Sequence, residues 1–142
     1  MTDDEFLNAF EQAALTRAQW THAAHLRMAW LYSRRERTLE AALARMRAGI
    51  PRLNAALGTA PHLYHDTVTC AFGTLVYGRA TAPDAPASWT DFQTTHPDFF
   101  DRAAPILHRF YRPETLTSEE ARTGFVPPDL RAFPSLPSRV LR

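Results

Sequence analysis

The stretch Trp20-Thr21-His22-Ala23-Ala24-His25-Leu26 lies in the most strongly helical part of the chain and carries two histidines three positions apart. Residues i and i+3 project from the same face of a helix, so His22 and His25 are expected to point in one direction. A second pair with the same spacing follows at His62 and His65. Helical bundles build metal sites from such side chains on facing helices. The pattern therefore predicts a helical bundle with chemistry centred on histidine.

Apolar residues at helical spacing predict four main helices in the first half of the chain. Residues able to cap the first three helices at their N-termini are Asp3 or Asp4, Thr16 and Thr38. The second helix is expected to run to about Ser33. Pro51 is expected to kink the third helix or break it near Gly49, and Gly58 is a natural stop at its C-terminal end.

The start of the fourth helix decides where the second histidine pair lies. If Pro61 takes the first helical position, His62 and His65 share one helical face. If Asp66 is the cap instead, both histidines lie in the entry turn. In either case the helix is expected to run to about Arg79.

The chain beyond residue 80 holds nine of the 11 prolines and predicts shorter elements. Ser88 is expected to cap a short helix through Thr94. A segment from Pro97 to Arg112 is expected to bend or restart at Pro105, and about one helical turn is expected over 118–122. The tail from about residue 126 is expected to wrap over the bundle, because its apolar side chains would otherwise be exposed. The fold expected for 1–142 is thus a single all-α domain, a bundle of four main helices with short C-terminal helices and an extended proline-rich tail.

Composition narrows the classes of function. The 142 residues fit one domain, and the formal net charge of +1 gives no general attraction to nucleic acid or anionic membranes. All 16 basic residues are arginine, so this chain has no lysine for a Schiff base. Cys70 is the only cysteine, which excludes an intramolecular disulfide and fits inert packing. The acidic N-terminus and the lack of a long apolar run predict a cytoplasmic protein outside the membrane. The sequence also leaves a homodimer possible.

The histidines suggest a transition-metal centre. Zinc, iron, copper and nickel accept neutral imidazole, and three protein ligands with one open position are typical of a catalytic site. His22 and His25 supply two ligands, and His65 is the natural third. His62 is a weaker candidate, and His108 lies on a later segment. The interpretation is a divalent metal held by three histidines between helices.

Polar residues beside His65 complete the predicted site. Asp66 could orient an imidazole or act as a general base, and Tyr64 and Thr69 could hold a catalytic water or the reacting group. Thr67 offers a further hydroxyl to the substrate. Asp66, Tyr64 and Thr69 are therefore the expected catalytic residues. Thr67 is expected to bind the substrate.

Two more residues are candidates for substrate binding. Trp20 could wall an apolar pocket, although aromatic residues on a buried helix usually belong to the core. Arg122 could clamp a carboxylate or phosphate. The alternative for Arg122 is a salt bridge to Glu119 or Asp129 that fixes the tail.

Three segments together resemble a family of small uncharacterised bacterial proteins: 20–26, 64–69 (Tyr-His-Asp-Thr-Val-Thr) and 118–130 (Ser-Glu-Glu-Ala-Arg-Thr-Gly-Phe-Val-Pro-Pro-Asp-Leu). The resemblance covers most of the chain and implies that the three motifs form one unit; it brings no established activity with it. A helical bundle with three histidines is also loosely similar in architecture to the DinB-like metalloproteins. That group usually has an HxxxH spacing, where this chain has HxxH.

Two hypotheses of function result. The first is a metal-dependent enzyme that acts on a small molecule at His22, His25 and His65, with hydrolysis, group transfer and oxidation all compatible. The second is a non-catalytic helical module that binds a ligand or a protein and has a structural histidine patch.

Overall fold

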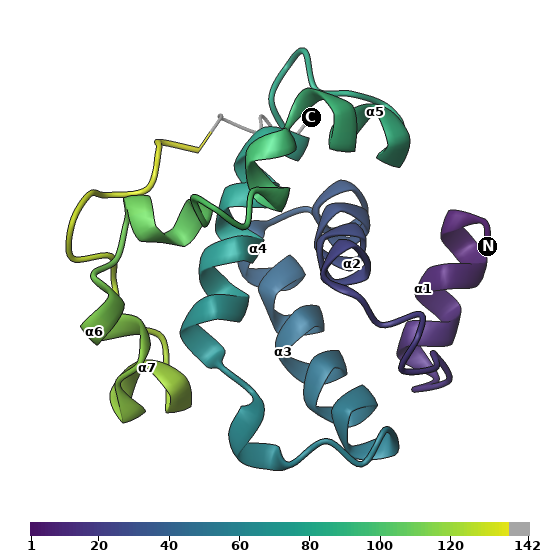
Figure 1. Ribbon diagram of the computed structural model, residues 1–142. Helices are drawn as coiled ribbons and strands as arrows, with labels where there is room; N and C mark the ends of the chain where they lie inside the picture. The colour runs from purple at the N-terminus through teal and green to yellow at the C-terminus, as the bar shows by residue number, and fades with distance from the viewer. Residues whose placement is uncertain (137–142) are drawn as a thin grey trace.

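The three longest helices pack against one another at the centre of the molecule (Figure 1). They are α2 (His22–Arg35), α3 (Leu39–Ala56) and α4 (Asp66–Ala80). The remaining α-helices are α1 (Asp3–Glu11), α5 (Trp89–Thr95), α6 (Pro113–Leu116) and α7 (Glu119–Thr123). Single turns of 3-10 helix span Pro61–Leu63, Pro97–Phe100 and Ile106–Arg109. This computed structural model describes residues 1–136, which contain no strand, so the all-α prediction is confirmed for them.

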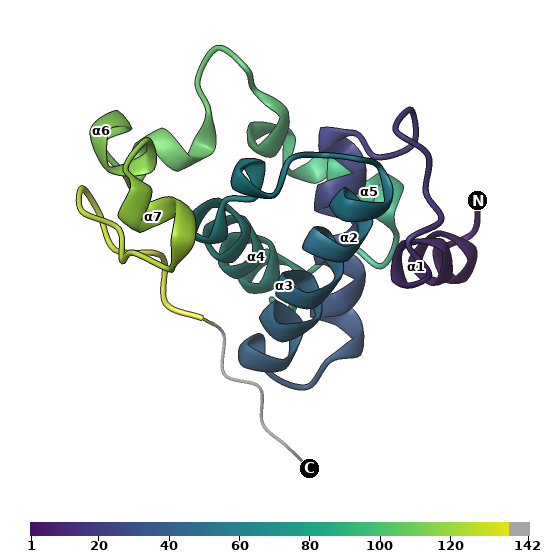
Figure 2. The same ribbon diagram turned by 90° about the horizontal axis from the view of Figure 1, so that it is seen from below.

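α4 makes the most extensive contacts in the bundle, and α2 and α3 both pack against it and against each other (Figures 1 and 2). Its buried residues lie on more than one face, which fits a helix enclosed by neighbours. α1 packs against α2 and α3, and α7 packs against α4. Figure 1 shows α1 on one side of the central helices and α6 and α7 on the opposite side.

Two of the predicted N-terminal caps are wrong. α1 is capped by Thr2, which forms a reciprocal capping box with Glu5, and Asp3 and Asp4 lie in its first turn. α2 is capped by Thr21. The hydroxyl of Thr16 instead accepts a hydrogen bond from the backbone of Gln19 in a separate turn, so Trp20 precedes the helix. The predicted caps Thr38 and Ser88 are confirmed.

The third helix does not break near Gly49. α3 continues through Pro51 to Ala56, and Gly58 beyond it adopts a left-handed φ of 74° as expected for a stop. Pro51 is exposed, whereas Ile50 and Leu53 beside it are buried in the core. Packing of this apolar face outweighs the one backbone hydrogen bond that proline removes.

The C-terminal segment is tied to α4 through Thr67. The Thr67 hydroxyl donates to the carbonyl of Gly124 (2.8 Å) and accepts from the amide of Val126 (2.9 Å). Phe133 packs against Phe110 and Tyr111. Phe125 and Leu130 remain 42% and 50% exposed, so the tail is only partly buried. The end of the predicted tail, 137–142, lies outside the described residues.

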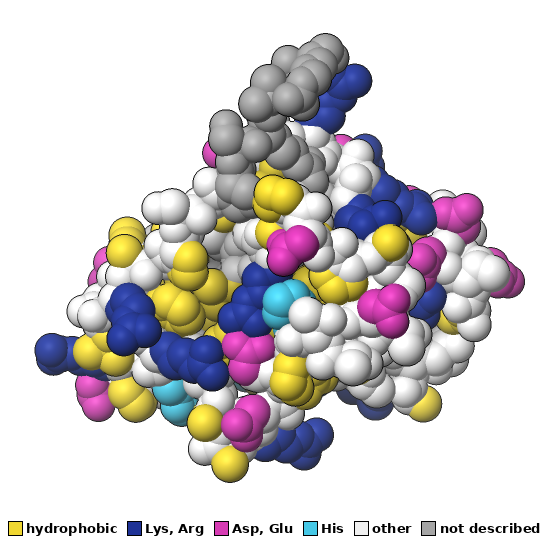
Figure 3. Space-filling view, turned by 90° about the horizontal axis from the view of Figure 1, so that it is seen from above, with side chains coloured by type: hydrophobic (Ala, Val, Ile, Leu, Met, Phe, Trp, Pro, Cys, Tyr) yellow, Lys and Arg dark blue, Asp and Glu magenta, His cyan; other side chains and the backbone are white. Residues whose placement is uncertain are grey.

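The surface carries charges of both signs. Figure 3 shows arginine and acidic side chains intermixed on the face seen from above. In the part of the chain that the structure describes, no helix combines the length and apolarity needed to cross a membrane.

Gly49 is the contact point between α3 and α1. A Cβ atom at this position would overlap Cε2 and Cζ of Phe10, whose ring is fully buried. Gly49→Ala should therefore lower the free energy of unfolding by about 1–2 kcal/mol, because overpacking outweighs the gain in helix propensity. Urea denaturation measures the change. Gly124→Ala, where nothing lies within 4 Å of the added atom, is the control; equal effects of both would contradict this packing of α3 on α1.

Candidate functional site

The two histidines of α2 lie on one face of that helix, as predicted, and line a common cavity. The cavity has a volume of about 290 Å³ and lies between α2, α3 and α4. Its walls are formed by His22, His25, Leu26, Met28, Ala29, Met46, Ile50, Val68, Thr69, Phe72 and Gly73. None of these residues is an acid or an arginine, so the polar side chains that the described residues bring to the wall are two imidazoles and one hydroxyl.

The hydrogen bonds of His25 fix its tautomer. Its Nδ1 lies 2.7 Å from the carbonyl oxygen of Thr21 and therefore donates a hydrogen to it. Burial lowers the pKa of His25 and outweighs the opposing effect of the Thr21 carbonyl, so the ring is neutral at pH 7. Nε2 then carries a lone pair and forms no hydrogen bond within residues 1–136. The ring also stacks on Trp20 at 3.7 Å between centroids, which fixes its orientation.

His22 closes one end of the cavity. Its Nε2 lies 2.9 Å from the carbonyl oxygen of Phe99 and donates to it, which links α2 to the turn Pro97–Phe100. The edge of its ring meets Phe72 of α4 at 5.7 Å between centroids. His22 is otherwise exposed, so it stands at the boundary between the cavity and solvent.

His65 has a different role from the other two histidines. It is the N-cap of α4, and its Nδ1 accepts the backbone amide of Val68 at 3.1 Å. Its Nε2 lies 2.6 Å from the carbonyl oxygen of Leu116 and donates to it. Both ring nitrogens thus have backbone partners. The predicted cap Asp66 is therefore wrong by one residue, because His65 takes the cap position and Asp66 begins the helix. His62 lies exposed in the turn before α4, so the two histidines do not share one helical face.

The structure does not bring His65 to the cavity that His22 and His25 line. Among residues 1–136, no three His, Cys, Asp or Glu side chains are placed to hold a metal ion. His22 Nδ1 and His25 Nε2 are the imidazole nitrogens at the cavity whose hydrogen bonds leave them available as ligands. A metal bound by three histidines stays a prediction, and it requires His65 to give up at least one of its two hydrogen bonds.

Asp66 is held in an ion pair that the sequence did not reveal. Arg47 of α3 donates to both carboxylate oxygens, at 3.0 and 2.6 Å, and the hydroxyl of Tyr64 donates to one of them at 2.8 Å. Burial acts to raise the pKa of Asp66, but these hydrogen bonds and the charge of Arg47 outweigh it and hold the pKa below its usual range. Burial is also the main reason why the pKa of Tyr64 is raised. The Asp66 side chain is 8% exposed and its oxygens are occupied, so the group joins α3 to α4.

The predicted hydroxyl groups separate into two environments. Thr69 lines the cavity, and its hydroxyl donates to the carbonyl of His65 at 3.0 Å, which leaves its oxygen able to accept. Thr67 is fully buried and holds the C-terminal segment, away from the cavity. Trp20 stacks on the His25 ring and is not among the residues that line the cavity. Its indole Nε1 is buried without a partner among the described residues.

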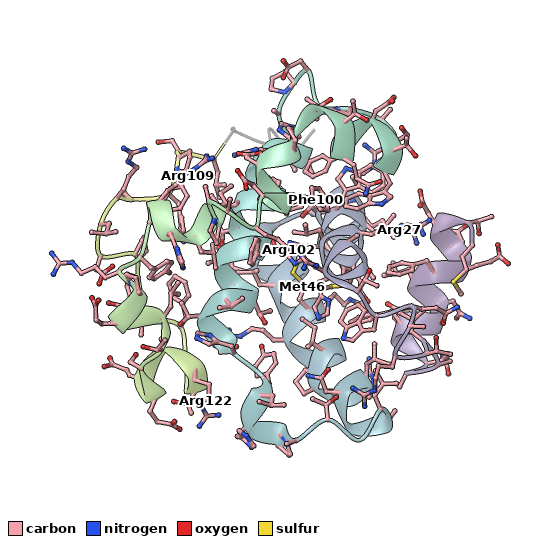
Figure 4. All side chains as sticks on the ribbon, in the orientation of Figure 1. Arg27, Met46, Phe100, Arg102, Arg109 and Arg122 are labelled. Carbon is pink, nitrogen blue, oxygen red and sulfur yellow. The ribbon has the colours of Figure 1, made fainter. Side chains whose placement is uncertain are left out.

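Arg122 takes the second of its two predicted roles. It forms a salt bridge with Glu119 in the same short helix, and its Nη1 donates to the carbonyl of His62 at 3.1 Å. Figure 4 shows Arg122 at α7, on the other side of α4 from α2. Cys70, by contrast, is buried. Burial raises the pKa of its thiol to about 11, so a nucleophilic thiolate at this position is unfavourable.

The apolar wall of the cavity was not anticipated. On α2 it is formed one turn after His25, at Met28 and Ala29, and on α4 one turn after Thr69, at Phe72 and Gly73. Both sets follow the i, i+3, i+4 spacing, so they could have been found by continuing the histidine face along each helix. Met46 and Ile50 of α3 repeat that spacing, but only the fold shows that they face the histidines.

Comparison of the chain with protein-family models, with curated proteins and with solved structures finds no match. The cavity and the side chains that line it are therefore the basis for assigning a function.

The cap on α4 gives the first test of the site. His65→Ala should lower the free energy of unfolding by about 2 kcal/mol, because it removes both the cap and the bond to Leu116. His65→Asn keeps a capping oxygen and should lose about half as much. Urea denaturation measures both, and an unchanged stability of His65→Ala would contradict the structural role.

Proposed function

We propose that this protein binds a small molecule whose apolar part fills the cavity between α2, α3 and α4. The observation that carries the proposal is a volume of about 290 Å³ with apolar walls and a free imidazole acceptor, His25 Nε2, on a ring that burial keeps neutral. Small-molecule sites are typically concave and apolar, with a few polar groups that set orientation. The cavity is near the lower end of their usual size, which favours a compact ligand.

The wall of the cavity determines the charge of the part that enters it. No acidic or arginine side chain of residues 1–136 lines it, and His25 is neutral because burial lowers its pKa. Burying an ion without a partner costs several kcal/mol or more. The part of the ligand inside the cavity is therefore uncharged.

The tautomer of His25 sets the polar contact. Because Nδ1 donates to Thr21, Nε2 presents a lone pair and accepts a hydrogen bond. A hydroxyl or N–H group on the ligand satisfies it, whereas a carbonyl does not. Thr69 offers a further acceptor in the same wall.

The pair p-cresol and toluene tests this contact, since the two differ only in a hydroxyl group. We expect p-cresol to bind about fivefold more tightly, which corresponds to one net hydrogen bond of about 1 kcal/mol. Binding is measured from amide chemical shifts of Met28, Met46 and Val68. His25→Phe keeps a ring against Trp20 and should abolish the preference for p-cresol, while His108→Phe, a change at an exposed site outside the cavity, should preserve it. Absence of shifts at the cavity with both compounds would overturn the proposal.

The affinity for p-cresol should also depend on pH. Protonation of His25 turns its acceptor into a donor, and burial holds its pKa below the ordinary 6.5. The affinity should be constant from pH 8 to about 6.5 and fall only below that value, while the affinity for toluene changes less. A loss of p-cresol binding centred above pH 6.5 would show that another group controls it.

The three-histidine metal enzyme is the competing proposal, and elemental analysis distinguishes the two. If the protein binds an apolar ligand at this cavity, we expect purified protein to carry no stoichiometric Zn, Fe, Cu or Ni and His22→Ala to leave metal content unchanged. One equivalent of metal that is lost in folded His22→Ala and in folded His65→Ala would support the enzyme and contradict the proposed ligand binding.

A further inference from the structure

A second cavity adjoins the first at the side chains of His22 and Phe72. It has a volume of about 300 Å³, and its remaining walls are formed by Phe99, Phe100, Asp101, Arg102, Pro105 and Ile106. We call it the outer cavity and the one between α2, α3 and α4 the inner cavity. His22 and Phe72 line both. The two spaces are therefore neighbours that share this pair of side chains as a boundary.

The outer cavity differs from the inner one because it contains a cationic group. Arg102 lines it, is exposed, and makes no ion pair or hydrogen bond within residues 1–136. By contrast, the nearby Arg79 and Arg109 both pair with Asp98. In Figure 4, Arg102 lies in projection between Phe100 above and Met46 below, over the space between α4 and α2.

One carboxylate oxygen of Asp101, the acidic neighbour of Arg102, is already engaged. Asp101 Oδ1 accepts hydrogen bonds from the backbone amides of Ala103 and Ala104, at 3.0 and 3.2 Å. These bonds hold the carboxylate toward its own loop, and no ion pair joins it to Arg102 among the described residues. The guanidinium is thus the charged donor that the outer cavity offers to a ligand.

The boundary between the cavities is made of side chains that can change rotamer. His22 meets Phe72 at 5.7 Å and Phe100 at 5.9 Å, both edge to face, and is held to the loop by one hydrogen bond to Phe99. Because His22 and Phe72 line both spaces, a change of rotamer at either side chain would join them. A ligand longer than the inner cavity can then extend outward past His22.

From this arrangement we infer that the natural ligand is an anionic amphiphile, a small carboxylic acid with an apolar chain that carries the hydroxyl or N–H group for His25 Nε2. The chain occupies the inner cavity and the carboxylate pairs with Arg102 at the rim. This inference rests on the proposed function and adds the class of ligand. The charge stays in the exposed outer cavity, where its desolvation is small, and the guanidinium matches a carboxylate with two donors.

Octanoate and 1-octanol provide the test, because they share a chain length and differ in charge. We expect octanoate to bind about threefold more tightly at low salt, an advantage typical of an exposed ion pair, and the advantage to shrink as salt is added. Arg102→Gln should reduce octanoate to the level of 1-octanol and leave 1-octanol unchanged. Arg109→Gln, which removes a similarly exposed arginine outside both cavities, should change neither.

The outcomes separate this inference from the proposed function. If p-cresol and 1-octanol shift the amides of the inner cavity but octanoate gains nothing from Arg102, the inference is wrong and the proposed function stands. If neither p-cresol nor 1-octanol binds at the inner cavity, the proposed function fails and the inference with it. Octanoate shifts that move Arg102 and Val68 together, and that Arg102→Gln weakens, would support the acid ligand.

Discussion

The two hydrogen bonds of His65 are the constraint on which the arrangement of the site depends. One caps α4 at the amide of Val68, and the other joins that cap to Leu116 at the end of α6. Together they set where α4 begins and how the C-terminal segment docks on it. They also use both nitrogens of the ring, so His65 serves the fold while His22 and His25 face the cavity. A change at His65 would therefore act first on the start of α4 and on its link to Leu116.

The rest of the site follows from how α4 is held between its neighbours. Arg47 and Asp66 join α3 to α4 through two hydrogen bonds, and His22 joins α2 to the loop at Phe99. Between these ties the side chains are small or flexible, including Ala29, Gly73 and Met46, and they leave the inner cavity unfilled. These hydrogen bonds connect the elements around the inner cavity, and none of the charged side chains that form them lines it. An apolar space bordered by a few polar groups is typical of a small-molecule site.

Sequence reasoning succeeded where a structure is decided locally. Thr38 and Ser88 cap helices within three residues, and Gly58 stops one through its own backbone conformation. It failed at the start of α2, because Thr16 and Thr21 both have a local partner and only the packing of the helix selects Thr21. That His22 and His25 lie on one face of α2 was predictable from their i, i+3 spacing. The partners of His65 and Asp66 were not, since Leu116 and Arg47 lie 51 and 19 positions away.

The protonation of the imidazole nitrogens tests the central claim, that His25 is a free acceptor in the wall of an apolar cavity and His65 is a structural cap. Long-range ¹H–¹⁵N spectra at neutral pH measure it directly. We predict a hydrogen on Nδ1 alone for His25 and on Nε2 alone for His65, with p-cresol shifting Nε2 of His25 and leaving His65 unchanged. A hydrogen on Nε2 of His25, or a p-cresol response at His65 in place of His25, would contradict the claim.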